Sequence, residues 1–345
     1  MSTPMPLRGA LATLIDGRDL TRTQMREAMG TIMAGETTPA QIAGFLVALR
    51  IKGETAEEIA GGADAMRAAA VTITPRRRDL VDTAGTGGDG ANTWNISTAA
   101  ALVAAAAGAG VAKHGNRAAS SATGAADVLE ALGFNLAAAP ELIERSIDEL
   151  GFGFLFAPAH HPAMRHAGPV RRELATRTIF NLLGPLTNPA GARAQVIGVY
   201  SAEIAPTIAH ALVALETEHA FVVHGAGGID ELSPSGPNLV CEVRAGRVRR
   251  YELDPLDLGV ARADPAELRG GDAAHNARGL RDMLAGAPGA HRSAALLNAA
   301  AAITAAGHAA DLAEGLRAAT DAVDSGAAAE RLEALAAFTY DAKRR

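Results

Sequence analysis

Residues 79–98 read DLVDTAGTGGDGANTWNIST, and this stretch carries the strongest signal for the fold. It opens with a short apolar run that indicates a buried β-strand. Gly85, Gly87 and Gly90 follow at the spacing G-x-G-x-x-G, and a helical pattern begins near Ser97. A strand, a glycine-rich loop and a helix in this order favour anion binding, because backbone N–H groups and the helix N-terminus both face the ligand. The spacing alone is weak evidence, since a plain tight turn gives the same pattern.

The residues around the loop indicate which anion it binds. A dinucleotide site requires an acidic residue at the end of the next strand, but the basic segment KHGNR (113–117) stands there and favours a ligand with more phosphate charge. No G-x-x-x-x-G-K-[S/T] motif follows the first strand, so a P-loop ATPase is not expected. Asn95, Ser97 and Thr98 place an amide and two hydroxyls on the first turn of the helix. Capping explains them equally well in isolation, but next to the glycines we favour contact with phosphate.

Strand and helix patterns organise the remainder of the chain. Capping boxes at 21–24, 38–41 and 55–58 predict short helices within residues 21–70. Beyond the glycine loop, strands alternate with helices, which predicts an α/β fold with a mostly parallel sheet flanked by helices. The tail from about residue 275 is again helical in pattern.

Composition excludes several classes of protein. The 345 residues are 48% apolar but only 3% aromatic, so small aliphatic side chains must fill the core. The net charge of −6 disfavours nucleic-acid binding. Cys241 is the only cysteine, which excludes an internal disulfide and a cysteine metal cluster. Without a signal-like apolar core or a membrane-length apolar run, a cytoplasmic protein with no membrane partner is expected.

An arginine cluster follows in HPAMRHAGPVRRELATRTIFNLLGPLTNP (161–189). Pro169 is expected to begin a helix with Arg171 and Arg172 in its first turns, where positive charge opposes the helix dipole. Because this placement is unfavourable, we assign a function to Arg171, whose guanidinium can hold a carboxylate by two parallel hydrogen bonds. Arg177 is interpreted as a surface residue in a salt bridge.

Two pairs of residues are candidates for metal binding. His160 and His161 are adjacent and have no further His or Cys at ligand spacing, so a structural role is expected. Asp230 and Glu231 follow an apolar strand and a glycine-rich turn in HGAGGIDEL. Their carboxylates suit Mg²⁺, which binds hard oxygen ligands together with substrate phosphates. As a solvated pair they should contribute little to the stability of the fold.

The motifs GTGGD, NIST, KHGNRAASS, HPAM and RTIFNLLGPLTNP, with the Asp-Glu pair after HG, occur in an order that resembles the anthranilate phosphoribosyltransferase family of tryptophan biosynthesis. The resemblance covers almost the whole chain. It implies transfer of the phosphoribosyl group of phosphoribosyl pyrophosphate to the amine of anthranilate, giving N-(5-phosphoribosyl)anthranilate and pyrophosphate, with Mg²⁺. It also implies a homodimer formed through the helical domains.

The same resemblance implies a domain organisation. Residues 1–73 would form a small helical domain, joined by helices from about 162–186. Residues 74–161 and 187–345 would form the α/β domain that binds phosphoribosyl pyrophosphate, with the active site in the cleft between the two.

Site residues are carried over from the resemblance to matching positions. The glycine loop would bind pyrophosphate, Lys113, Asn116 and Arg171 would position the substrates, and Ser97, Asp230 and Glu231 would bind Mg²⁺. The expected substrate-binding residues are Gly85, Thr86, Gly87, Gly88, Asp89, Thr93, Asn95, Ser97, Thr98, Lys113, His114, Gly115, Asn116, Ala125, His161 and Arg171.

Two further points concern the chemistry. Ala125 stands where the family commonly has a serine, so one hydroxyl contact is either lost or supplied by Thr123. No side chain is assigned as acid, base or nucleophile, because the aromatic amine is already neutral at pH 7 and the sugar carbon becomes cation-like as pyrophosphate leaves. Alignment and neutralisation of the leaving charge can therefore carry the reaction.

Two other functions remain open at this point. A pyrimidine nucleoside phosphorylase shares the helical domain and a similar glycine loop, but KHGNR together with the Asp-Glu pair favours the transferase. A non-catalytic relative that binds nucleic acid should have a basic surface and lack the acidic pair, neither of which fits this sequence.

Overall fold

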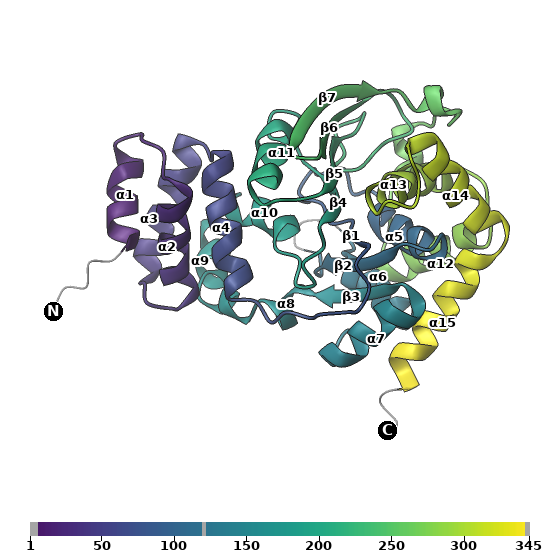
Figure 1. Ribbon diagram of the computed structural model, residues 1–345, viewed down its shortest axis with the longest axis horizontal. Helices are drawn as coiled ribbons and strands as arrows, with labels where there is room; N and C mark the ends of the chain where they lie inside the picture. The colour runs from purple at the N-terminus through teal and green to yellow at the C-terminus, as the bar shows by residue number, and fades with distance from the viewer. Residues whose placement is uncertain (1–5, 119–121, 342–345) are drawn as a thin grey trace.

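Helices α1 (Pro6–Ile15), α2 (Arg22–Met33), α3 (Pro39–Lys52) and α4 (Ala56–Ala68) form one end of the computed structural model, which describes residues 6–118 and 122–341 (Figure 1). All three predicted capping boxes are confirmed: Thr21, Thr38 and Thr55 each accept a hydrogen bond from the third helical N–H, and the Gln or Glu there binds back. Helix α1 was not expected from the sequence.

The strands of the described residues form one seven-stranded sheet in the order β3-β2-β1-β4-β5-β6-β7. Strands β1 to β5 are parallel to one another, whereas β6 is antiparallel to β5 and β7 is antiparallel to β6. The bounds are β1 (Leu80–Asp82), β2 (Gly110–Gly115), β3 (Phe152–Phe156), β4 (Ala194–Gly198), β5 (His219–His224), β6 (Asn238–Arg244) and β7 (Arg247–Leu253). The mostly parallel sheet is therefore confirmed.

The β6–β7 hairpin was not expected. Its last strand, RVRRYEL, forms one edge of the sheet and is largely exposed. Because charged side chains are frequent in this strand, its sequence resembles that of a surface loop. Such charges protect an exposed sheet edge from pairing with another chain.

Helices cover both faces of the sheet (Figure 1). Those that pack on the strands are α5 (Ile96–Ala106), α7 (Pro140–Leu150), α11 (Ala205–Ala214) and α13 (Ala290–Ala305). Outside them lie α6 (Ala125–Ala131), α12 (Ala273–Leu284), α14 (Leu312–Asp324) and α15 (Ala327–Asp341), with 3₁₀ turns η3 (Pro255–Leu258) and η4 (Pro265–Leu268). Among the described residues, none of the helices has the length and apolar character needed to span a bilayer.

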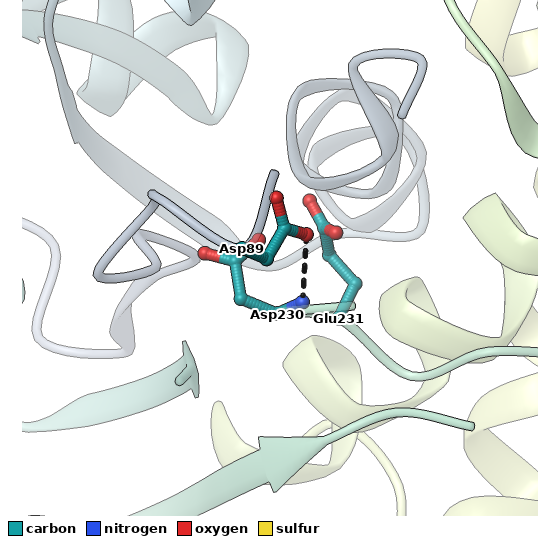
Figure 2. A group of neighbouring side chains, drawn as sticks. All are labelled: Asp89, Asp230 and Glu231. Atoms are coloured by element: carbon teal, nitrogen blue, oxygen red, sulfur yellow. Dashed lines mark hydrogen bonds between the residues drawn. The ribbon is translucent and has the colours of Figure 1, made fainter. Parts of the chain in front are cut away.

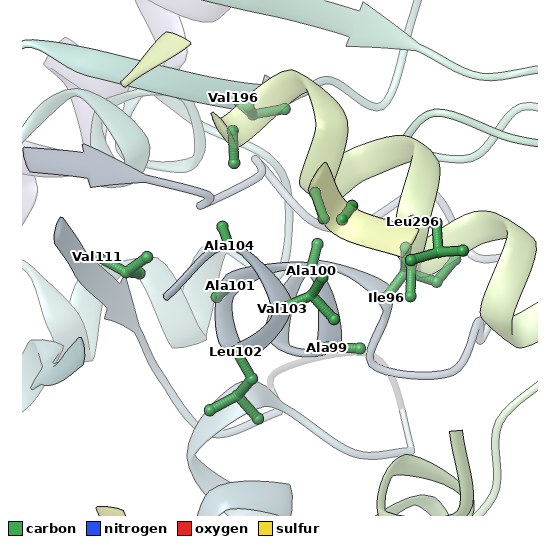
Figure 3. Close-up of a cluster of buried hydrophobic side chains, with 14 of the residues drawn as sticks. Ile96, Ala99, Ala100, Ala101, Leu102, Val103, Ala104, Val111, Val196 and Leu296 are labelled. Atoms are coloured by element: carbon green, nitrogen blue, oxygen red, sulfur yellow. The ribbon is translucent and has the colours of Figure 1, made fainter. Parts of the chain in front are cut away.

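Alanine fills the core between the sheet and α5, as the composition indicates. Residues 99–105 of α5 are all buried, and most of them are alanine. Figure 3 shows this helix grouped with Val111 of β2, Val196 of β4 and Leu296 of α13. The small side chains let the backbones of α5 and α13 approach closely, and they pack without aromatic residues.

Residues 157–186 form short helices that return to the N-terminal helices. These are α8 (Ala157–His160), η1 (Pro162–Arg165), α9 (Gly168–Leu174), α10 (Ile179–Leu183) and η2 (Gly184–Leu186). Val170 and Phe180 belong to the same buried cluster as residues of α2, α3 and α4. Helix α9 has only seven residues, and the residue that caps its C-terminus, Ala175, has a left-handed φ of 47°.

The length of α9 corrects one expectation. Arg171 and Arg172 lie in its last turn, where the helix dipole favours a positive charge. The prediction that they oppose the dipole in the first turns is wrong, and it no longer supports a function for Arg171.

Strand order positions the functional site. Strands β2 and β3 lie on one side of β1, and β4 and β5 lie on its other side. The direction in which successive strands are placed therefore reverses between the neighbours β1 and β4. In open α/β sheets, ligands bind beyond the carboxyl ends of the strands at such a point. The glycine loop leaves β1 there, and Gly198 ends β4.

Gly198 leaves no room for a side chain at this point. A Cβ added there would lie 1.4 Å from the backbone oxygen of Asp230. Gly198→Ala is therefore expected to push the 225–231 loop away from the sheet and to lower the free energy of unfolding by about 1–3 kcal/mol.

Urea unfolding measures this effect. Gly30→Ala is the matched control, because Gly30 lies inside α2 with no atom within 4 Å of an added Cβ; it should leave stability unchanged or raise it. Equal midpoints for Gly198→Ala and the wild-type protein would contradict the tight packing.

Candidate active site

A cleft of about 320 Å³ opens beyond the carboxyl ends of β1 and β2. Its walls come from the glycine loop, the start of α5, the end of β2 and the segment before α6, and Asn181 of α10 contributes from the helical side. Of the expected site residues, it brings together Gly85, Thr86, Gly87, Gly88, Asp89, Thr93, Asn95, Ser97, Thr98, Lys113, His114, Gly115, Asn116, Ala125, Asp230 and Glu231. His161 and Arg171 do not line it. The end of the KHGNRAASS motif, residues 119–121, lies outside the described residues.

The glycine loop is held by backbone hydrogen bonds to the neighbouring strand and loop. The N–H of Thr86 donates to the carbonyl of Gly198 at 2.8 Å, and the N–H of Gly87 donates to Asp230 Oδ2 at 2.7 Å. Gly87 and Gly88 have left-handed φ values of 63° and 77°, which only glycine adopts freely. At Gly85 an added Cβ would lie 2.7 Å from Asp230 Oδ2. The glycines therefore allow the loop to lie directly against a carboxylate.

Asp89, Asp230 and Glu231 form an acidic cluster whose ligand oxygens lie within 4.8 Å of one another (Figure 2). The N–H of Asp230 donates to Asp89 Oδ2 at 3.2 Å. Burial and the nearby Asp89 charge raise the pKa of Asp230 to about 7. Burial, Asp230 and Asp89 together raise the pKa of Glu231 well above its ordinary value. Crowded, desolvated carboxylates of this kind are stabilised by a cation.

This burial corrects the expectation of a solvated pair. Asp230 is only 9% exposed, so the pair is part of the interior wall of the cleft. Glu231 Oε2 is buried without a hydrogen-bond partner. An unpartnered carboxylate oxygen beside two further carboxylates fits a divalent cation that binds hard oxygen ligands. Ser97 lines a small cavity together with both acids.

Lys113 lies beneath the cleft as a buried cation. Its Nζ donates to the carbonyl and the hydroxyl of Thr83 at 3.0 and 3.1 Å, and to Ser97 Oγ at 3.4 Å. Burial lowers the pKa of Lys113 to about 8, an effect that Asp82 and Glu231 oppose. Lys113 thus supplies positive charge between the end of β1 and the first turn of α5.

The side chain of Asn95 precedes α5 but makes no capping hydrogen bond. Its Nδ2 donates to the carbonyl of Thr123 at 3.2 Å, and its Oδ1 accepts from Asn276 Nδ2 at 2.9 Å. Capping therefore does not explain Asn95. Thr98 Oγ1 is buried without a partner, and the Thr123 hydroxyl donates to the carbonyl of Gly271 at 2.7 Å. Thr123, which was expected to supply the hydroxyl that Ala125 lacks, therefore already uses its hydroxyl proton in this bond.

His114 and His161 form a buried pair with ring centroids 5.0 Å apart. Burial lowers the pKa of His114 to about 3 and that of His161 to about 4, so both rings are neutral at physiological pH. His114 Nδ1 donates to the carbonyl of Gly184 at 3.1 Å, which leaves its Nε2 as an acceptor. The Nε2 atoms of both rings are buried and unpartnered. His160, by contrast, donates from Nδ1 to the carbonyl of Val71 at 2.7 Å, in agreement with a structural role.

Arg171 lies outside the cleft wall, with its guanidinium 5.3 Å from the ring centroid of Phe180. Burial lowers its pKa, and no carboxylate of the described residues pairs with it. Phe180 adjoins Asn181, which does line the cleft.

The structure contradicts the interpretation of Arg177 as a surface residue in a salt bridge. Within the described ranges no carboxylate pairs with it. Its guanidinium donates to the carbonyl of Gly88 in the glycine loop and lies 4.0 Å from the ring centroid of Tyr200. It therefore belongs to the surroundings of the cleft.

Comparison with known proteins agrees with this geometry. Residues 77–329 match the glycosyl transferase family a/b domain, and residues 8–70 match its helical bundle domain. The chain is 55% identical over 333 residues to the anthranilate phosphoribosyltransferase of Anaeromyxobacter sp. (strain K), covering 96% of this chain and 98% of the relative. The chain belongs to the anthranilate phosphoribosyltransferase family. The enzyme of Symbiobacterium thermophilum is 52% identical over 334 residues, 97% of this chain and 98% of its own length.

Solved structures of anthranilate phosphoribosyltransferases share the fold. That from Thermus thermophilus superposes with a TM-score of 0.91 at 50% identity, covering 96% of this chain and 99% of its own. The Saccharomyces cerevisiae enzyme in complex with PRPP, which is phosphoribosyl pyrophosphate, and Mg has a TM-score of 0.89 at 28% identity, covering 98% and 99%. The resemblance and the fold class are thus confirmed, and the phosphorylase and nucleic-acid alternatives are not favoured.

Three features of this anthranilate phosphoribosyltransferase fold were not identified from the sequence. Asp89 was expected only as part of the pyrophosphate loop, and the structure also places its carboxylate beside Asp230 and Glu231. A carboxylate within a phosphate loop was a usable signal for this cluster, because such a loop otherwise presents positive dipoles. Asn181 accepts from the N–H of Thr178 at 3.1 Å in a short capping box that ends RTIFN. Trp94, the single tryptophan, lines the cleft and stacks on His291 with centroids 4.7 Å apart.

The acidic cluster predicts an unusual dependence of stability on pH. The pKa of Asp230 is about 7 in the folded protein against an ordinary 3.8, so the folded state binds the proton more tightly than the unfolded state. Stability should fall as pH rises through this window, and the full penalty applies above pH 7 when no cation is bound. Asp230→Asn removes that penalty while keeping an oxygen acceptor for Gly87. It should melt above the wild-type protein at pH 8 in EDTA.

Thermal melts between pH 4 and pH 8 test this expectation. The difference should vanish toward pH 4 and should shrink when Mg²⁺ is added to the wild-type protein. Asp16→Asn, at an exposed carboxylate paired with Arg18, is the control and should show no comparable gain. An Asp230→Asn variant that melts below wild type at pH 8 without divalent cations would contradict the electrostatic argument.

Proposed function

We propose that this protein transfers the phosphoribosyl group of phosphoribosyl pyrophosphate to the amine of anthranilate, giving N-(5-phosphoribosyl)anthranilate and pyrophosphate in tryptophan biosynthesis. The observation that carries the proposal is the acidic cluster facing the glycine loop in one cleft. Relatives at 52–56% identity are named for this activity, and yeast structures are described as complexes with PRPP and Mg or with 4-fluoroanthranilate.

The donor set supports Mg²⁺ as the cofactor. Asp230 and Glu231, assisted by Ser97, would hold the ion, and Asp89 is close enough to share it. When bound, the ion would neutralise negative charge on the pyrophosphate as this group leaves. The unpartnered Glu231 Oε2 supports this assignment over a purely structural cluster.

The remaining residues would position the substrates. Glycine-loop N–H groups, the hydroxyls of Thr86 and Thr93 and the first turn of α5 would bind phosphoribosyl pyrophosphate, and Lys113 would support this region from below. Gly115, Asn116, Ala125 and His114 line the cleft and would surround anthranilate, together with His161, which packs against His114. Arg171, which lies outside the cleft wall beside Phe180, would reach the carboxylate of anthranilate from there. The neutral imidazoles present apolar rings with acceptor nitrogens, so they would not repel the neutral amine. Binding and alignment then account for the rate without a side-chain base.

We also propose the domain division expected from the sequence, with residues 1–73 and about 162–186 as the helical unit. Packing of α9 on α3 and of α10 on α3 and α4 supports it. The buried cluster of this unit continues into α11 and strands β4 to β6, so the two units share an apolar interface. A homodimer through this unit is supported by exposed apolar side chains on α1 and α3: Ile15 is 70% exposed, Ile51 is 81% and Val47 is 37%. A cytoplasmic location stays a prediction from the sequence.

The activity is tested by the fluorescence of anthranilate. The signal should decay only when phosphoribosyl pyrophosphate and Mg²⁺ are both present, and chelation with EDTA should stop it. Parallel reactions with thymidine or uridine and inorganic phosphate examine the rival chemistry. Cleavage of a nucleoside without any consumption of anthranilate would overturn the proposal.

Arg171→Ala tests the carboxylate contact. Because a hydrogen bond to a charged group contributes about 1.5–3 kcal/mol, the KM for anthranilate should rise roughly tenfold to over a hundredfold. The KM for phosphoribosyl pyrophosphate should not change. Arg172→Ala, at the exposed neighbour on the same helix, is the control. Unchanged kinetics with anthranilate would remove Arg171 from the site and leave it as a support for Phe180.

A further inference from the structure

Arg177 lies in the short connection between α9 and α10 and reaches across to the glycine loop. Its guanidinium donates to the carbonyl of Gly88, and a Cβ added at Gly88 would lie 3.4 Å from its nitrogen atoms. Since α9 and α10 pack against the N-terminal helices, this contact joins the helical unit to the loop that begins the cleft.

The guanidinium is held in place by an aromatic ring. It lies 4.0 Å from the ring centroid of Tyr200, a distance typical of a cation–π contact. Tyr200 is itself tied to the glycine loop, because its backbone N–H donates to the hydroxyl of Thr86 at 3.2 Å. Arg177 is therefore oriented by Gly88 of the cleft wall and by Tyr200, which is bonded to Thr86 of that wall.

Contact with Gly88 also orients the loop. The Gly88 carbonyl and the Asp89 N–H belong to one planar trans peptide, so they point in opposite directions. With the carbonyl held by Arg177, the Asp89 N–H points away from the guanidinium. Gly88, with a left-handed φ of 77°, adopts this arrangement without steric cost.

The charge of Arg177 has no carboxylate partner in the part of the chain that the structure describes. Several exposed arginines elsewhere in the chain are paired, as Arg193 is with Glu218 and Arg145 is with Glu149. A guanidinium carries five N–H donors, and the Gly88 carbonyl uses only part of this capacity. The free donors suit a phosphate group, which guanidinium binds through paired, charge-assisted hydrogen bonds.

We propose that Arg177 is a further substrate-binding residue, which holds the Gly88 carbonyl in the free enzyme and binds the pyrophosphate group of phosphoribosyl pyrophosphate. This inference rests on the proposed function for the identity of the substrate. It adds a cation from the helical unit to a site whose other phosphate contacts come from the α/β part of the chain.

Kinetics of Arg177→Gln and Arg177→Lys test the proposal, with Arg172→Gln as the matched control. Arg177→Gln should raise the KM for phosphoribosyl pyrophosphate about tenfold or more, as expected for a lost charge-assisted bond, and should leave the KM for anthranilate unchanged. Arg177→Lys should fall between Gln and wild type, because it keeps the charge but loses the paired donors. Arg172→Gln should behave as wild type.

Calorimetric titration with magnesium pyrophosphate provides a readout that needs no turnover. Arg177→Gln should weaken this binding by a similar factor while its melting temperature stays near that of the control. Equal pyrophosphate binding in Arg177→Gln and wild type would overturn the proposal, as would an equal rise in both KM values accompanied by a lower melting temperature. If the wild-type protein consumes no anthranilate, the proposed function fails, whereas an Arg177-dependent affinity for pyrophosphate would still support the phosphate contact.

Discussion

A single residue, Asp230, connects the loops that form the site. Its Oδ2 accepts from the N–H of Gly87 at 2.7 Å, and its backbone N–H donates to Asp89. Two loops are joined in this way, one leaving β1 and the other following β5, and both cross the end of β4 between them. Gly85 and Gly198 must lack side chains for the contact to form. The arrangement of the cleft therefore depends on one buried acid packed against backbone.

The electrostatics of the cleft follow from that constraint. Packing Asp230 against the glycine loop brings Asp89 and Glu231 close to it. Burial, together with repulsion from the neighbouring carboxylates, raises the pKa values of Asp230 and Glu231. The surrounding cations are placed at the margins: Lys113 lies beneath the first turn of α5, and Arg177 contacts the outer face of the loop. Negative charge at the centre and positive charge at the edge suit a ligand that arrives as phosphate together with a divalent ion.

Local sequence chemistry predicted most of the fold because its rules act over a few residues. The capping boxes at Thr21, Thr38 and Thr55 and the glycine-loop unit were confirmed because each pattern specifies its own backbone bonds. The errors concern where a helix ends and which distant residues come into contact. Helix α9 stops after seven residues, which reversed the dipole argument for Arg171, and Arg177 found its partner 89 positions away in sequence. The burial of Asp230 and Glu231 likewise arises from Gly198 and the glycine loop, which no local pattern connects to the acidic pair.

The alanine-rich layer under the cleft has a consequence for how this protein can change. Along residues 99–105 of α5, and on the facing turns of α13, most buried side chains are single methyl groups. A methyl group has no rotamers to lose or to exchange, so this layer has very few alternative packings. Truncation can remove little, whereas almost any enlargement would have to separate α5 from the sheet and move its first turn, which lines the cleft. Variation accumulating in such a chain should therefore be concentrated on the outer helices and the β6–β7 edge, and the floor of the cleft should stay fixed as the rim diversifies.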